Sequence, residues 1–73
     1  MKKINKKMDA MGLEPGTIIY SEKSSDYNYY KIVQWAELQG WYEVICLESD
    51  EDLTETDEKS RLMPEDLIDD YIL

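Results

Sequence analysis

Residues 29–47 read YYKIVQWAELQGWYEVICL, and this stretch decides the fold. Its two ends, residues 29–35 and 41–47, are rich in β-branched and aromatic residues, which pack well on a pleated surface. Gly40 lies between them, where a hairpin turn favours a residue that tolerates positive φ. The stretch therefore predicts a β-hairpin. Because apolar residues occupy odd and even positions of 41–47, we expect that strand to be central and covered on both faces, with Ile45 in the core.

Shorter segments on either side of the hairpin complete a mainly β fold. Residues 17–20, Thr-Ile-Ile-Tyr, predict a first strand, and the polar residues 21–28 predict a loop. The segments after the hairpin are, in chain order, an acidic loop or ragged hairpin at 48–58 anchored by Leu53, a short strand at 59–63, a single helical turn that begins at Pro64, and a closing strand or extended tail at 68–73.

The first twelve residues allow two interpretations. Ile4, Met8 and Met11 recur at helical spacing, and Gly12 is well placed to end a short helix. Four lysines in the first turns oppose the helix dipole, which favours a basic tail instead. We therefore expect residues 1–12 to be a short helix or a tail, and residues 13–73 to be a single small β domain.

One segment carries a resemblance to a known family. Leu62-Met63-Pro64-Glu65-Asp66-Leu67-Ile68 resembles the part of SH3 domains in which a strand ends, a proline opens a 3₁₀ turn and the last strand begins. The resemblance, with the number of strands and the order of loops, implies a small SH3-like five-stranded barrel. The Ala-Leu-Tyr-Asp-Tyr opening of SH3 domains is absent, and Leu67 stands where an aromatic residue is expected, so polyproline binding is not implied.

Charge is distributed unevenly along the chain. The sequence has a net charge of −9 and no histidine, and residues 37–73 hold 13 Asp and Glu against Lys59 and Arg61. This net charge exceeds what a small domain needs to stay soluble, and the excess lies in one half of the chain. The pattern indicates a partner that recognises the acidic half.

The same composition argues against catalysis and against a resident metal. Without histidine, acid–base chemistry near neutral pH needs a strongly shifted carboxylate or lysine, and a small barrel has little depth in which to desolvate one. Cys46 lacks a histidine partner and is predicted to be a core residue. Residues 50–54 begin like a calcium loop, but Glu55 replaces the required glycine and Arg61 the final glutamate. We expect no enzyme, no metal and no cofactor.

Nucleic acid and membrane are not expected to be direct partners. From Asp9 onward the chain has 17 acids against four bases, and this balance repels phosphates and anionic lipids. No stretch approaches the roughly 18 apolar residues of a membrane-spanning helix, and no apolar signal segment follows the first lysines. With a single cysteine, the chain is predicted to be cytoplasmic.

Closely spaced carboxylates can approximate the charge density of DNA. An extended chain rises about 3.3 Å per residue, and a DNA strand offers a phosphate about every 3.4 Å. The sequence therefore favours a non-catalytic protein that occludes a basic, nucleic-acid-binding surface of another protein, as DNA-mimic inhibitors do. In type it resembles phage-encoded anti-restriction and anti-CRISPR inhibitors. The residues expected on the acidic face are Glu48, Asp50, Glu51, Asp52, Glu55, Asp57, Glu58, Glu65, Asp66, Asp69 and Asp70.

A second function remains open from sequence. An SH3- or Tudor-like adaptor would bind a peptide or an assembly subunit through an aromatic patch, and a methyl-lysine cage needs several converging aromatics. The same aromatics could fill the core and its rim, and the acids could serve solubility alone. The residues of this alternative patch are Tyr27, Tyr29, Trp35, Trp41 and Tyr42.

Overall fold

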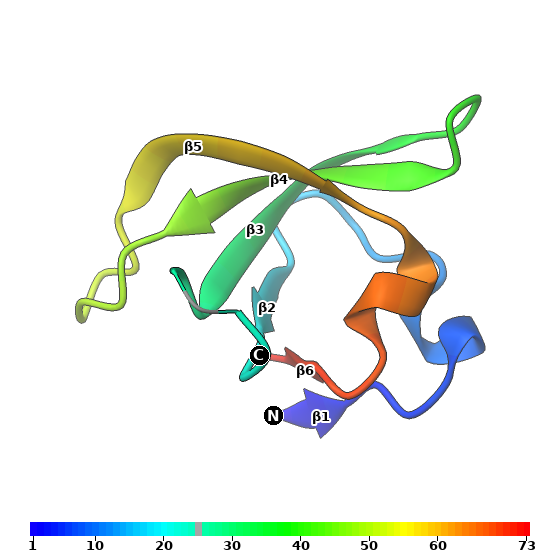
Figure 1. The fold of residues 1–73 in the computed structure, drawn as a ribbon, viewed down its shortest axis with the longest axis horizontal. Coiled ribbons are helices and arrows are strands. Elements are labelled where there is room, and N and C mark those ends of the chain that lie inside the picture. The colour runs from blue at the N-terminus through cyan, green and yellow to red at the C-terminus, as the bar shows by residue number, and fades with distance from the viewer. Residues whose placement is uncertain (25) are drawn as a thin grey trace.

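The computed structural model describes residues 1–24 and 26–73. Their strands form one antiparallel sheet of six strands in the order β1-β6-β2-β3-β4-β5 (Figure 1). A mainly β fold is therefore confirmed, whereas the sheet is open in the part of the chain described, so a closed five-stranded barrel is not confirmed. The elements are β1 (Lys2–Lys3), η1 (Lys7–Ala10), β2 (Ile18–Tyr20), β3 (Tyr29–Ala36), β4 (Trp41–Leu47), β5 (Glu55–Leu62), η2 (Pro64–Leu67) and β6 (Tyr71–Ile72), where η marks a 3₁₀ turn.

The central feature is the predicted hairpin of β3 and β4. The two strands pair from Tyr29 opposite Leu47 to Ala36 opposite Trp41, with a β-bulge at Val33. At the turn, Gly40 has φ +79° and its amide donates a hydrogen bond to the carbonyl of Ala36 at 2.8 Å. A positive φ at this position explains why glycine stands there. The hairpin is confirmed.

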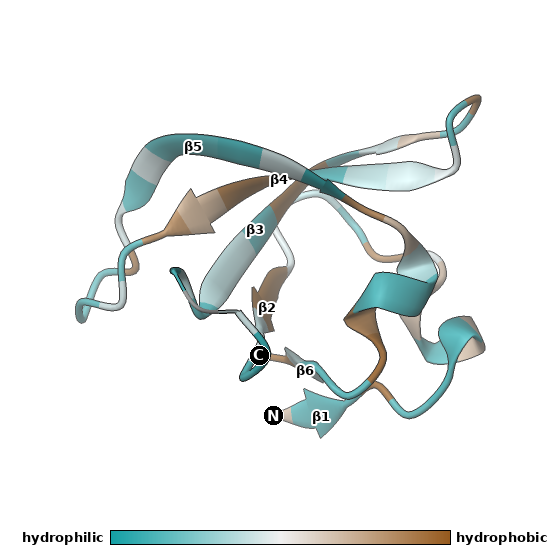
Figure 2. Ribbon diagram, viewed as in Figure 1, coloured by the Kyte–Doolittle hydropathy of each residue, from teal (hydrophilic) through white to brown (hydrophobic). Residues whose placement is uncertain are grey.

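One face of the hairpin forms the core. Ile32, Tyr42 and Val44 are about 1% exposed and pack with the fully buried Ile19 and Leu67. Figure 2 shows hydrophobic stretches along β2 and β4. On the opposite face of β4, Trp41, Glu43 and Ile45 are only half-buried. The expectation that β4 is covered on both faces was wrong, because the rest of the chain folds onto one face. β4 is an internal strand, flanked by β3 and β5, but Ile45 lies outside the core cluster.

Residues 1–12 belong to the same fold. Ile4 and Ala10 are fully buried in the core, and β1 pairs with β6, so the two chain ends lie side by side (Figure 1). The Ile4 amide donates to the Asp70 carbonyl at 2.8 Å, and the Tyr42 hydroxyl donates to the Ala10 carbonyl. Neither an α-helix nor a tail is found. A short 3₁₀ turn suffices because burial of two apolar side chains, rather than helix propensity, holds the segment.

The second half departs from expectation in its strand lengths. β5 begins at Glu55, four residues before the predicted strand, so part of the acidic run is extended and paired with β4. The turn at Pro64 is confirmed as η2. β6 is two residues long, since Asp69, with φ +76°, turns the chain sharply just before it.

Candidate functional site

The β4–β5 connection and β5 carry the densest group of acids. All seven of these carboxylates are exposed, and the hairpin that carries them projects from the body of the molecule (Figure 1). We name this group the acidic arm, which consists of Glu48, Asp50, Glu51, Asp52, Glu55, Asp57 and Glu58. We expected these residues to share a surface from the sequence, and the structure places them on one hairpin.

Asp50 shapes the turn of the arm. Its carboxylate accepts hydrogen bonds from the Asp52 amide at 3.1 Å and from the amide and hydroxyl of Thr54 at 3.2 and 3.0 Å. These bonds, above all those from Thr54, hold the pKa of Asp50 below its ordinary value. The local bonds also stabilise Leu53 in a left-handed conformation, with φ +49°. Asp50 therefore has a structural task that the sequence pattern did not reveal.

The rest of the arm is poorly compensated. Lys31 contacts Glu55 at 2.9 Å, and this is the arm's only ion pair among the residues that the structure describes. Six carboxylates thus lie in solvent without an ion-pair partner among the described residues. Such a group produces a negative potential that extends beyond the surface.

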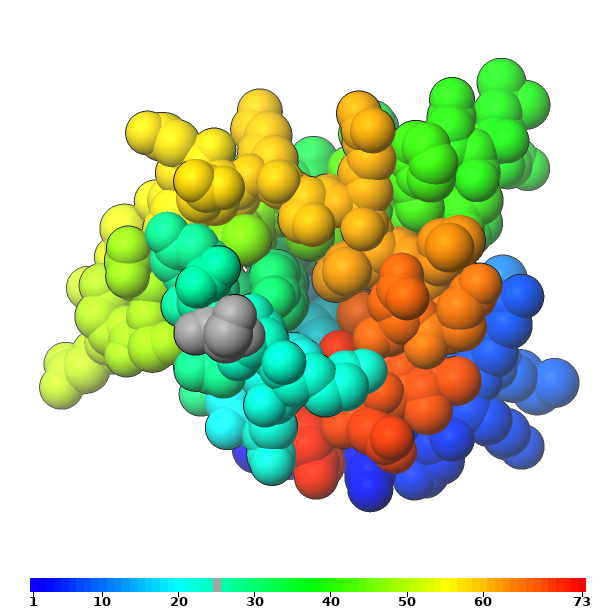
Figure 3. Space-filling model, viewed as in Figure 1, coloured from blue at the N-terminus to red at the C-terminus, as the bar shows by residue number. Residues whose placement is uncertain are grey.

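A groove of about 720 Å³ runs beside the arm, between the 21–28 loop and β5, and Figure 3 shows this side of the molecule hollowed there. Asp26, Glu48 and Glu58 supply its carboxylates, and Tyr27 and Tyr30 contribute aromatic surface. Desolvation, and next the charges of Glu48 and Glu58, raise the pKa of Tyr27. Asp26 was not predicted as a site residue, because nothing in the polar 21–28 loop indicates that it faces the arm.

The acids near the C-terminus are held differently. Glu65 lies 3.8 Å from the Lys7 ammonium, and Asp69 lies 3.9 Å from that of Lys3. Asp66 accepts a hydrogen bond from the Met63 amide at 2.8 Å at the start of η2. We name Glu65, Asp66, Asp69 and Asp70 the C-terminal acids. Each of them is bound to a cation or to the backbone of the same chain.

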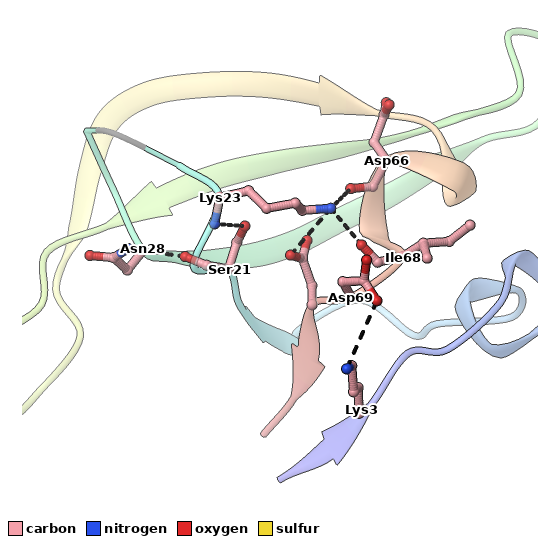
Figure 4. Close-up of polar contacts among 8 residues, drawn as sticks. Lys3, Ser21, Lys23, Asn28, Asp66, Ile68 and Asp69 are labelled. Carbon is pink, nitrogen blue, oxygen red and sulfur yellow. Dashed lines mark hydrogen bonds and ion pairs between the residues drawn. The ribbon is translucent and has the colours of Figure 1, made fainter.

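Asp70 is the most constrained of these acids. It is 2% exposed, and its Oδ1 lies 3.5 Å from Lys23 Nζ. The same ammonium donates to the carbonyls of Asp66 at 2.8 Å and Ile68 at 2.6 Å (Figure 4). Burial raises the pKa of Asp70, while Ser21 and Lys23 oppose that rise. The assignment of Asp70 to an accessible binding face was wrong, because its side chain is buried beside Ser21 and Lys23.

The eleven acids predicted for one face are thus divided. Seven lie on the acidic arm, three are exposed around η2 and β6, and Asp70 is buried. Three of the four C-terminal acids lie against lysines from the N-terminal half, and no sequence pattern indicates these pairings.

The predicted aromatic residues do not converge. Tyr42 is buried, and its ring packs on the partly exposed Trp35 with centroids 4.8 Å apart. Trp41 lies on the other face of β4, where the Arg61 guanidinium stacks 5.1 Å from its ring centroid. Tyr29 packs at 5.0 Å on Tyr20, a residue that the sequence did not single out. In the described residues these side chains form separate pairs, with Tyr27 apart at the groove.

Chemistry at the remaining candidate groups is limited. Cys46 is buried, and desolvation, followed by the charges of Glu58 and Asp26, raises the pKa of its thiol. Within residues 1–24 and 26–73, no set of three or more acidic, cysteine or histidine side chains is arranged to hold a metal ion. The same residues include no helix with the length and apolar character to cross a membrane.

Comparisons of the chain with protein-family models, with curated proteins and with solved structures find no match. Its function is therefore inferred from the geometry and charge of the molecule itself.

Proposed function

We propose that this protein is a non-catalytic, cytoplasmic interaction protein whose acidic arm occludes a basic, nucleic-acid-binding surface of another protein. The supporting observation is the contrast in charge compensation. Six of the seven arm carboxylates have no ion-pair partner among the described residues, whereas three of the four C-terminal acids each contact a lysine. Uncompensated charge on a projecting hairpin steers a basic partner and complements its surface.

The shape of the arm supports the same proposal. β5 is extended, and an extended chain rises about 3.3 Å per residue. This rise is close to the axial spacing of about 3.4 Å between successive phosphates of one DNA strand. A narrow hairpin can enter a groove that accommodates a nucleic-acid strand, and its carboxylates can then displace the counterions of that groove. Among inhibitors, those that phages direct against restriction or CRISPR enzymes are of this type, and we propose such an enzyme as the partner.

The test begins with an affinity pull-down to identify the partner. The arm variant Glu48→Gln, Glu51→Gln, Asp52→Asn removes three exposed charges and retains Asp50, which shapes the turn. Its thermal stability should change by less than about 0.5 kcal/mol. Affinity for the partner should fall at least about tenfold, since close charge pairs in interfaces couple by about 1.5 kcal/mol or more.

The matched control removes three charges elsewhere. Glu14, Glu22 and Glu37 are also exposed, and their replacement by Gln changes net charge equally. This control should leave affinity nearly unchanged, and raising salt from about 50 to 200 mM should weaken binding by the wild type. Equal losses in both variants, or binding that ignores salt, would contradict occlusion by the arm.

A second function is favoured by one specific observation. Trp35 is 36% exposed and lies over Tyr42 at the β3–β4 hairpin, a position from which an aromatic ring can contact a peptide. An adaptor with an SH3- or Tudor-like barrel would use this surface. The pairwise arrangement of the described aromatics gives no support to a methyl-lysine cage. Loss of binding in Trp35→Ala, with the arm variant unaffected, would favour the adaptor.

A further inference from the structure

Among the described residues, β5 lies at one edge of the sheet and pairs with β4 alone. It is eight residues long, and six of these are exposed. The outward N–H and C=O groups of such a strand are available to pair with another strand. We infer that β5 pairs antiparallel with β5 of a second copy of this chain, which extends the sheet through a two-fold axis.

Charge on β5 favours this particular partner. Glu55, Lys59 and Arg61 pair with Leu47, Ile45 and Glu43, which are alternate residues of β4, so these three share one face. Alternation of side chains along β5 assigns Asp57, within the bulge, to the same face. The groups around them agree: Glu55 and Lys59 lie with Lys31 and Ile45 at one hollow, and Lys59 and Arg61 lie with Glu43 at the next. From Glu55 to Arg61, the residues of this face are therefore two acids followed by two bases.

Antiparallel pairing turns this order into complementarity. A two-fold axis perpendicular to the sheet passes between two copies of the same residue, and we place it at Glu58. Glu55 then lies opposite Arg61 of the second copy, and Asp57 opposite its Lys59, and each pair occurs twice. Four opposite-charge pairs thus form on one face, and directly opposed charges of this kind stabilise antiparallel strands.

The β-bulge of β5 is compatible with this pairing. β5 spans Glu55 to Lys59 while β4 spans only Leu47 to Ile45, so β5 contains two extra residues. Because side chains alternate along a strand, a bulge of two extra residues keeps Glu55 and Lys59 on the same face. The Thr56 hydroxyl donates to the Cys46 carbonyl at 2.8 Å and accepts from the Glu58 amide at 3.1 Å, so polar groups of the bulge are satisfied within the chain.

One contact in this register is unfavourable. Glu58 lies on the axis, on the opposite face, and meets Glu58 of the second copy, where like charges weaken the association. Charges on an edge strand commonly prevent unspecific pairing. The charges on β5 disfavour most partners and most registers of pairing. The antiparallel register centred on Glu58 is the arrangement in which they complement one another. Glu55, Asp57 and Glu58 of the acidic arm become part of the dimer contact. The turn of the arm, with Glu48, Asp50, Glu51 and Asp52, lies outside the paired strands and stays exposed to another partner.

The experiment measures the dimer dissociation constant by sedimentation over a wide concentration range, at physiological salt. Lys59→Glu should weaken the dimer by roughly tenfold to a hundredfold, because two attractive pairs become repulsive. The exchange Asp57→Lys with Lys59→Glu restores opposite charges in the same register and should restore dimerisation. Glu58→Gln should strengthen it. Lys6→Glu, at an exposed site far from β5 in the sequence, changes net charge as Lys59→Glu does and serves as the control.

Loss in Lys59→Glu together with recovery in the charge exchange supports the β5 pairing. Circular dichroism of each variant confirms that the exposed substitutions leave the fold intact. A wild-type protein that stays monomeric up to its solubility limit overturns the inference. So does a dimer that responds equally to Lys59→Glu and Lys6→Glu, or that the charge exchange fails to restore.

Discussion

The acidic arm and the C-terminal acids have similar compositions but different environments. Among the described residues, one arm carboxylate out of seven has an ion pair, whereas Glu65, Asp69 and Asp70 each lie within 4 Å of a lysine. The C-terminal acids lie where η2, β6 and the N-terminal segment meet. The arm acids mostly face solvent. Density of Asp and Glu in the sequence therefore does not distinguish a binding surface from a structural network, and the positions of the lysines do.

The lysine positions follow from topology. β1 lies beside β6, and η1 packs near η2, so the N-terminal lysines lie next to the C-terminal acids. The arm is at the other end of the strand order, where Lys31 is the cation in contact. A basic first segment thus neutralises one acidic region and leaves the other for a partner.

The largest effect that would test this contrast is expected from Lys23→Ala. The substitution removes the cation that faces the buried Asp70 and two hydrogen bonds to backbone carbonyls. Unfolding free energy should fall by about 2–3 kcal/mol, because a buried carboxylate is left unpaired. Urea unfolding measures the loss. Lys59→Ala, at an exposed lysine with no described ion pair, should change stability by less than about 0.5 kcal/mol.

The pH dependence of the stability loss in Lys23→Ala shows whether the unpaired Asp70 causes it. A carboxyl whose folded pKa is raised binds a proton more tightly in the folded state, so acidification through the window above its unfolded value stabilises the fold. Loss of Lys23 should raise the pKa of Asp70 further. The deficit of the variant relative to wild type should therefore shrink between pH about 7 and about 4. A deficit independent of pH would mean that Lys23 acts only through the carbonyls.

Asp50, in the acidic arm, is expected to have the opposite effect on the pH dependence of stability to that of Asp70. Its folded pKa is lowered, so the stability that it contributes is present above the unfolded value and is lost as pH falls through the folded value. Asp50→Ala should lower the melting temperature at neutral pH, by less than Lys23→Ala does, and the difference from wild type should vanish in acid. Asp52→Ala is the matched control, since the Asp52 amide, not its carboxylate, takes part in the turn. Equal melting temperatures of the two variants would contradict a structural role for Asp50.

Much of the fold could be predicted from sequence because its signals are local. β4 was predicted to the residue, and the turn at Pro64 was predicted from the proline that opens it. The start of β5 could not be predicted in this way, because Glu55 and Asp57 disfavour strands and only pairing with β4 makes them extended. Burial of Ile4 was equally hidden, since lysines and asparagine surround it in the sequence and its neighbours in the core are distant along the chain.

The division of the acids could not be predicted for the same reason. Lys23 and Asp70 are 47 positions apart, and a loop and a turn bring them together. The sequence did locate the arm, because the β3–β4 hairpin and the turn at Pro64 bound it on both sides. It could not indicate that Asp26, from the 21–28 loop, lies across a groove from Glu48 and Glu58.

The smallest expected effect tests whether the arm remains uncompensated in solution, and Tyr27 is its probe. The pKa of Tyr27 is raised by desolvation and then by the charges of Glu48 and Glu58. Because a nearby anion disfavours the phenolate, Glu58→Gln should lower the pKa of Tyr27 toward its ordinary value. Ring NMR signals of Tyr27, followed against pH in the alkaline range, measure the change.

Asp69→Asn removes the same charge from the C-terminal acids and should leave the pKa of Tyr27 unchanged. If both variants shift the pKa equally, Tyr27 responds only to net charge and the two acidic regions are electrostatically equivalent there. A shift in Glu58→Gln alone would show that the field of the arm is local and directed into the groove.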